Sequence, residues 1–203
     1  MNMMSSQRRT YTLKARAEQQ ADTRRRIVEA TAALHEEVGP ARTTVAEIAR
    51  RAGVSRLTVY NNFPDEKELF AACGDYWLGL NPPPDPSAVL GIEDPSERLR
   101  AVLRPFYAWY RRTARASENM HRDRLVLPAF DAVMRIRLDP VVSNLADTLA
   151  TGFAPAARSA KRLRAAVALA LDFWTWRRLS LEGLTDNAAA DLMVDSVKTA
   201  ARS

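Results

Sequence analysis

The chain has 203 residues, of which 47% are hydrophobic, enough apolar material for one or two packed domains and too much for a chain disordered over most of its length. Its net charge of +6 favours a polyanionic partner without identifying one, because many basic proteins bind no nucleic acid. The single cysteine, Cys73, excludes an intramolecular disulfide, and no apolar run approaches the roughly 18 residues of a membrane span, so we expect a cytoplasmic protein with no membrane partner.

The basic excess is concentrated near the N-terminus. Residues 1–30 contain seven Lys or Arg and three Asp or Glu, a surplus of four positive charges. Residues 1–20 show little apolar periodicity, and we predict a flexible basic arm there. Two interpretations stay open, since such an arm can follow DNA or be a solvated tail.

The first predicted helix runs from Thr23 to Val38. Apolar residues recur at helical spacing through it, at Ile27, Ala30 and Leu34, and Gly39 ends it. We expect its apolar stripe to pack behind the two helices that follow.

Residues 44–62 predict a helix, a tight turn and a second helix. Thr44 is a suitable N-cap, and Glu47 three residues later completes a capping box. Gly53 can adopt the positive φ of a sharp turn, and Ser55 can cap the second helix, roughly residues 56–62. We expect Val59 to face inward, which leaves the opposite face of this helix free.

That outward face carries side chains that suit a DNA major groove. Asn pairs with adenine and Arg with guanine, while Leu57 suits a thymine methyl group and the Tyr60 hydroxyl a phosphate. Asp65 caps a further helix, which places Lys67 in its first turn, where an ammonium and free N–H groups can hold a phosphate. The residues predicted to contact DNA are Thr44, Ser55, Arg56, Leu57, Thr58, Tyr60, Asn61, Asn62 and Lys67.

The segment from Ile27 to Phe70, about a fifth of the chain, resembles the DNA-binding domain of the tetracycline-repressor (TetR) family. The matching motifs, which recur in order, are RRRIVEATAALHEEVG, TTVAEIARRAGVS and TVYNNFPDEKELF. The chain departs from the family pattern at Leu57, where a small residue is common, and at Asn62, where a histidine is frequent. The first departure indicates a distinctive operator preference, and the second affects a family phosphate contact.

The resemblance implies an all-α homodimer with an N-terminal three-helix DNA-binding domain and a larger C-terminal helical domain that binds a small molecule and forms the dimer. We accordingly expect a basic arm at 1–20, a helix-turn-helix domain at 21–70 and an effector-binding and dimerisation domain at 71–203. The family also implies a repressor that binds a palindromic operator and is released by its effector. A DNA-binding regulator without a small-molecule ligand, either constitutive or gated by a protein partner, is the alternative.

The second domain is predicted to be helical. The helix that begins at Asp65 should reach into it and act as a lever between the domains. Residues 81–95 are rich in proline and end that section. Asp94 then caps a helix that Pro105 should kink or split, and shorter helices should follow in the ranges 121–137 and 141–153.

Aromatic residues of this domain suit an apolar pocket with a few polar groups, although filling the core is the more common use for any single one of them. The residues predicted to bind the effector are Trp77, Phe106, Trp109, Tyr110, Phe130 and Trp174.

Residues 159–183 are predicted to form one helix with apolar residues on two faces. A helix of this kind is normally buried between its own core and a second surface, and a partner chain is the simplest such surface. A last helix follows Gly183, and two helices from each protomer would form a four-helix bundle, as in the family. The residues predicted to form the dimer interface are Leu169, Phe173, Trp176, Met193 and Val197.

The sequence offers few residues for catalysis. It has two histidines and one cysteine, and it lacks a glycine-rich phosphate loop and a cluster of metal-ligand residues. We therefore expect no enzymatic activity, no cofactor and no metal. A carboxylate pair brought together by folding is the form of catalysis that remains open.

Overall fold

The structure is a computed structural model that describes residues 3–153 and 159–202. All regular structure in these residues is helical, which confirms the predicted fold class. None of the described helices is long and apolar enough to cross a lipid bilayer. The helices are α1 (Met3–Glu37), the 3-10 helix η1 (Pro40–Arg42), α2 (Val45–Ala52), α3 (Arg56–Asn62), α4 (Glu66–Leu80), α5 (Pro95–Arg112), α6 (Ala114–Asp123), α7 (Pro128–Arg137), α8 (Asp139–Ala150), α9 (Ala160–Leu171), α10 (Phe173–Leu181) and α11 (Asp186–Arg202).

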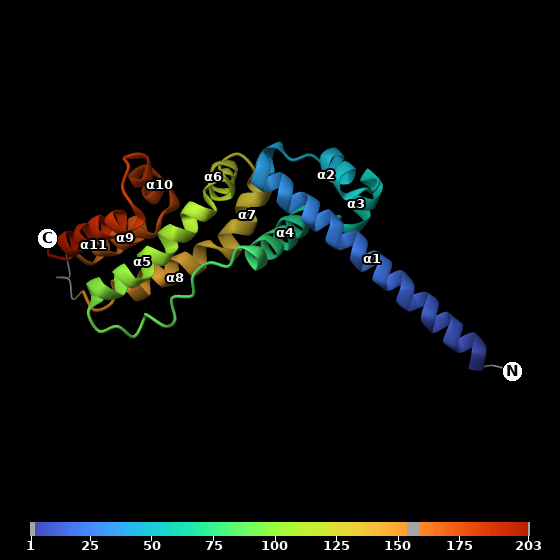
Figure 1. The fold of residues 1–203 in the computed structure, drawn as a ribbon, viewed down its shortest axis with the longest axis horizontal. Helices are drawn as coiled ribbons and strands as arrows, with labels where there is room; N and C mark the ends of the chain where they lie inside the picture. The colour runs from blue at the N-terminus through green and yellow to red at the C-terminus, as the bar shows by residue number, and fades with distance from the viewer. Residues whose placement is uncertain (1–2, 154–158, 203) are drawn as a thin grey trace.

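Figure 1 shows an elongated molecule with two ends. One end holds α2, α3 and the part of α1 that packs on them, around a core that includes Ile27, Ile48 and Val59. The other end is built on α5 and α8 to α11, around a core that includes Tyr107 and Trp176. The two cores share no residue, so each end buries its own apolar surface.

Helix α4 joins the two ends, as the sequence predicted for the helix after Asp65. Leu69 belongs to the core of the first end, whereas the adjacent Phe70 packs with Phe130 and Met134 of α7 in a separate small cluster. The rings of Phe70 and Phe130 meet edge to face, with their centroids 5.3 Å apart. One turn of α4 is therefore fixed on both sides.

Helix α1 begins far earlier than the predicted start at Thr23. It continues back to Met3, so residues 3–20 are helical in the structure rather than an irregular arm. The stretch contains no glycine or proline, and its Ala, Arg, Lys, Glu and Gln residues favour helix. Helix propagation from an already formed segment needs no apolar stripe, and periodicity therefore missed this part.

Helix α5 starts where the sequence predicted. The Asp94 carboxylate accepts hydrogen bonds from the N–H groups of Ser96 and Glu97, both at 2.8 Å. The helix does not split at Pro105, which lies within one continuous helix. Because Pro105 is exposed, water can reach the carbonyl group that loses its N–H donor.

The predicted single helix over residues 159–183 is wrong, because the chain turns at Asp172. This residue has extended backbone (ψ 134°), and its carboxylate accepts a hydrogen bond from the Thr175 N–H at 2.8 Å, which caps α10. The hydroxyls of Tyr107 and Tyr110 donate to the last carbonyls of α9. The two apolar faces thus belong to two helices, each with one face on the core.

Candidate nucleic-acid interface

The helix-turn-helix forms through the local signals that the sequence predicted. Thr44 Oγ1 accepts a hydrogen bond from the Glu47 N–H at 3.2 Å, and Ser55 Oγ accepts one from the Thr58 N–H at 3.0 Å. Gly53 has φ 66°, the left-handed conformation that the turn requires. The capping box itself is not completed, because the Glu47 carboxylate turns to Arg50, whose Nε donates to it at 2.9 Å.

Helix α3 presents one face to solvent and one to the core. Val59 is 1% exposed, whereas Leu57 is 66% and Tyr60 is 55% exposed. Arg56 and Asn61 are exposed beside them. A short helix that is anchored by a buried β-branched residue, and whose other face carries exposed polar and apolar side chains, can enter a DNA major groove as a rigid unit.

The other predicted contact residues lie around this face, and several of their polar groups already have partners. Thr58 and Asn62 are half-buried, and the Asn62 side-chain amide donates to the Thr58 carbonyl at 2.8 Å. The Lys67 N–H donates to Asp65 at 2.9 Å, so the Lys67 ammonium remains for a phosphate but its backbone N–H does not. Thr44 is exposed at the start of α2.

Two arginines of α1 form hydrogen bonds to the ends of α2 and α3, the two helices of the helix-turn-helix. The sequence did not predict these contacts. The Arg26 guanidinium donates to the Ala52 carbonyl at the end of α2, at 2.9 Å. Arg24 donates to the carbonyl of Asn62 at the end of α3, and its guanidinium lies 3.9 Å from the centroid of the Phe63 ring. Each arginine satisfies a carbonyl that a helix end leaves free, and such long-range pairing leaves no local sequence signal.

The end of α1 is also clamped to α6. The Asn119 amide donates to the carbonyls of His35 and Glu36, at 3.2 and 2.9 Å. The buried Asp123 carboxylate accepts from the Ala41 N–H at 2.9 Å. Gly39, with φ 95°, permits this approach, since a Cβ there would overlap the Asp123 carboxylate. This α1–α6 joint is a second connection between the two ends, and sequence reasoning missed it.

A buried His–Cys contact adds to the packing of α1 on α4. His35 Nδ1 lies 3.4 Å from Cys73 Sγ. Burial lowers the pKa of His35 to about 4, an effect that the charge of Asp123 partly opposes, and burial raises the pKa of the Cys73 thiol to about 12. Both groups are therefore neutral near pH 7, and Cys73 is the buried, unreactive thiol typical of structural cysteines.

Four of the six predicted effector residues lie along one row of ring contacts, because Tyr110 contacts Phe173 and Phe173 contacts Trp174. Trp109 lies between Trp77 and Tyr110, with ring centroids 6.0 and 5.4 Å away. Phe130 belongs to the α4–α7 cluster, and Trp174 lies beside the ring of His121, 6.5 Å between centroids. Phe106 is half-buried against the second core.

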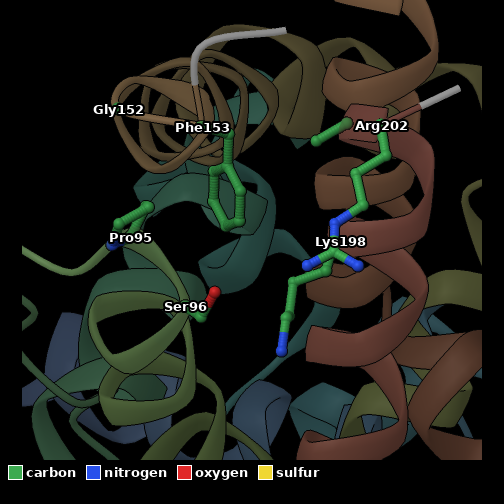
Figure 2. Close-up of a pocket in the computed structure, with 7 residues that line it drawn as sticks. Pro95, Ser96, Gly152, Phe153, Lys198 and Arg202 are labelled. Carbon is green, nitrogen blue, oxygen red and sulfur yellow. The ribbon is translucent and has the colours of Figure 1, made fainter.

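A pocket does open elsewhere on the second domain, between the start of α5, the end of α8 and the end of α11 (Figure 2). It encloses about 350 Å³ and contains none of the predicted effector residues. Lys198 and Arg202 bring cationic side chains to one side of it. The lining residues are Pro95, Ser96, Gly152, Phe153, Lys198, Ala201 and Arg202.

The predicted dimer residues divide into core and surface. Phe173, Trp176 and Val197 are at most 2% exposed within the single subunit, which corrects the prediction that they face a partner. The turn at Asp172 directs Phe173 and Trp176 into the subunit's own core. Leu169 is 57% exposed and Met193 is half-buried, so these two remain available to a second chain.

Comparisons with known proteins place the N-terminal part of the chain. The family model described as bacterial regulatory proteins, tetR family, matches residues 27–73. An uncharacterised HTH-type transcriptional regulator of Mycobacterium tuberculosis is 52% identical over 52 residues, which are 26% of this chain and 28% of that protein. The HTH-type transcriptional regulator BetI of Yersinia pestis is 38% identical over 81 residues, 39% of this chain and 41% of BetI. The matched segments thus span less than half the length of these relatives.

The fold as a whole is similar to two solved structures from Rhodococcus sp. RHA1. A transcriptional regulator shares 20% identity at a TM-score of 0.57, over 89% of this chain and 98% of that one. A TetR-like transcriptional regulator shares 20% identity at a TM-score of 0.54, over 86% and 93%. Because the identity is so low, these two structures support a similar fold and nothing more. The family model, by contrast, matches the segment that contains the exposed face of α3. Residues 27–73 are the helix-turn-helix DNA-binding segment of the TetR family of bacterial transcriptional regulators.

Proposed function

We propose that this chain is a transcriptional repressor that binds a palindromic DNA operator as a homodimer and leaves it when a small molecule binds. The observation that carries the proposal is the exposed face of α3, where Leu57 and Tyr60 project beside Arg56 and Asn61. Arg and Asn read bases by paired hydrogen bonds, and Leu57 supplies an apolar contact for a thymine methyl group. A regulator of this kind would act in the cytoplasm and needs no catalytic group.

Thr44 and Lys67 flank α3 from the starts of α2 and α4, and both are exposed. A hydroxyl and an ammonium at these positions suit the phosphates on either side of a major groove, where they position the helix without reading sequence. Two protomers with their α3 helices about 34 Å apart would then read half-sites separated by one turn of DNA.

Effector release would act through α4 and the α1–α6 joint. Phe70 packs on α7 and lies beside the ring of His35 of α1, and Asn119 of α6 donates to the end of α1. Arg24 and Arg26 connect α1 to the ends of α3 and α2. A ligand that favours another position of α4 or α6 would change the separation of the two α3 helices, and the operator would no longer fit both.

One observation favours the alternative, a regulator without a small-molecule ligand. The predicted effector residues pack against other aromatic or core side chains, with Trp109 8% and Phe130 7% exposed, and none of them lines the pocket. A thermal-shift screen separates the two functions. Compounds that raise the melting temperature and weaken operator binding support release by an effector, whereas a screen in which no compound class does so supports the alternative.

The test of DNA reading is selection of bound duplexes from a random pool, for the native chain and for Tyr60→Ala. We expect a palindromic consensus for the native chain and at least about tenfold weaker binding for the variant, whose melting temperature should not change because Tyr60 is exposed. Leu181→Ala, a change at a large exposed apolar residue of α10, is the matched control and should bind normally. Binding without a consensus, unaffected by Tyr60→Ala, would rule out α3 as the reading helix.

A further inference from the structure

The N-terminal half of α1 projects from the body of the molecule. Figure 1 shows it passing the α2–α3 unit and continuing away from the second domain. Arg24 is bonded to the end of α3, and every side chain from Lys14 to Asp22 is exposed. From residue 24 back to Met3 the helix rises about 1.5 Å per residue, so it extends about 30 Å beyond this anchor.

The charges of this projecting part differ from those of the anchored part. Downstream, Arg25 pairs with Asp22 and Glu29 at 2.5 and 2.8 Å, and Arg24 pairs with Glu68 at 2.6 Å. Arg24 thereby joins α1 to α3 and α4, and the charge of Arg25 is balanced within α1. Upstream, Lys14 pairs with Glu18 at 4.0 Å, but residues 3–20 contain four cations and this one acid, which leaves a surplus of three positive charges. The four cations are Arg8, Arg9, Lys14 and Arg16.

Residues 14–20 are exposed and so gain little from packing, and isolated helices are marginal in water. The surplus of like charges in residues 3–20 adds a repulsion that opposes the helix. Binding along a row of DNA phosphates would offset that repulsion. It would also release the counterions condensed on the DNA, which favours binding. An anionic membrane surface would offer similar charges, but residues 3–20 lack the apolar face that such helices bury in lipid. Residues 3–20 belong to the same helix as Arg24, which is bonded to α3, and this connection to the candidate DNA-reading helix favours DNA over a membrane.

We propose that residues 3–20 are a helical arm that binds the DNA phosphate backbone outside the half-site read by α3. The arm adds contacts that carry no sequence information, so it lengthens the footprint and strengthens the salt dependence of binding without altering the consensus. The proposal rests on the proposed function for the position of α3 on DNA, but binding of the arm to phosphate has its own readout.

The experiment uses the full chain with Arg8→Gln, Arg9→Gln, Lys14→Gln and Arg16→Gln combined. The matched control replaces four exposed cations of the second domain by Gln, at Arg112, Lys161, Arg162 and Arg202, and so removes the same charge. Affinity for the selected duplex is measured from about 50 to 200 mM salt, and the footprint is mapped with a chemical probe.

We expect the arm variant to bind at least about tenfold more weakly at low salt, with a salt slope reduced by about 0.9 for each phosphate that the variant no longer neutralises. Its footprint should shorten at the outer ends and its consensus should not change. An arm variant that matches the control in slope and footprint overturns the proposal. Salt-dependent binding that depends on the arm, without any consensus, would support the arm and reject the proposed function of α3.

Discussion

At the scale of single residues, His35 should make stability depend on pH. Its folded pKa of about 4 lies below the usual 6.5, so the unfolded chain takes up a proton first as the pH falls. The contribution of His35 to the free energy of unfolding is fully present above about pH 6.5, and it is lost progressively as the pH falls towards 4. At about 1.4 kcal/mol per unit, the loss is at most about 3 kcal/mol.

The variant His35→Gln should therefore flatten the decline in the free energy of unfolding between pH 6.5 and 4, measured by urea denaturation. His121 of α6, whose pKa is also lowered by burial, stacks on Phe173, and His121→Gln measures its separate contribution. Carboxylates titrate in the native chain as well as in each variant, so their contribution cancels when the pH dependence of a variant is compared with that of the native chain. An unchanged pH dependence in His35→Gln would mean that the imidazole does not lose its proton on folding.

At the scale of elements, the corner between α9 and α10 depends on α5. Tyr107 is fully buried, and its hydroxyl donates to the Ala170 carbonyl at 2.7 Å, where α9 ends. Tyr107→Phe leaves that buried carbonyl without this donor, and we expect the free energy of unfolding to fall by about 1–3 kcal/mol. Tyr60→Phe, on the exposed face of α3, should lower it by much less. Equal effects in thermal unfolding would contradict a structural role for the Tyr107 hydroxyl.

At the scale of the whole molecule, association of two protomers should involve exposed residues rather than the core. Leu169→Asp places a charge on a residue that is 57% exposed, so the subunit should stay folded while the dimer weakens. Phe173→Asp buries an unpaired charge at a residue that is 1% exposed, and should unfold the second domain instead. Sedimentation and circular dichroism together distinguish these outcomes. A folded Leu169→Asp variant that dimerises as strongly as the native chain would remove Leu169 from the interface.

The sequence by itself determined the parts of this protein that depend on local interactions. Caps and turns involve groups a few residues apart, so Thr44, Gly53, Ser55 and Asp94 marked helix ends that the structure confirms. The inward position of Val59 follows from the same short range, since consecutive residues of a helix point about 100° apart, which directs Tyr60 away from the face that Val59 buries. Local sequence patterns thus predicted which face of α3 is exposed.

Tertiary structure alone decided how those elements are joined. The apolar pattern over residues 159–183 fits one helix or two, and the capped turn at Asp172, with a hydrogen bond from Tyr107 to Ala170, selects two. The clamp of Asn119 on the end of α1, and the Arg24 contact with α3, join residues at least 38 positions apart. Contacts of this kind depend on how helices meet in space, and no periodicity or spacing along the chain records that.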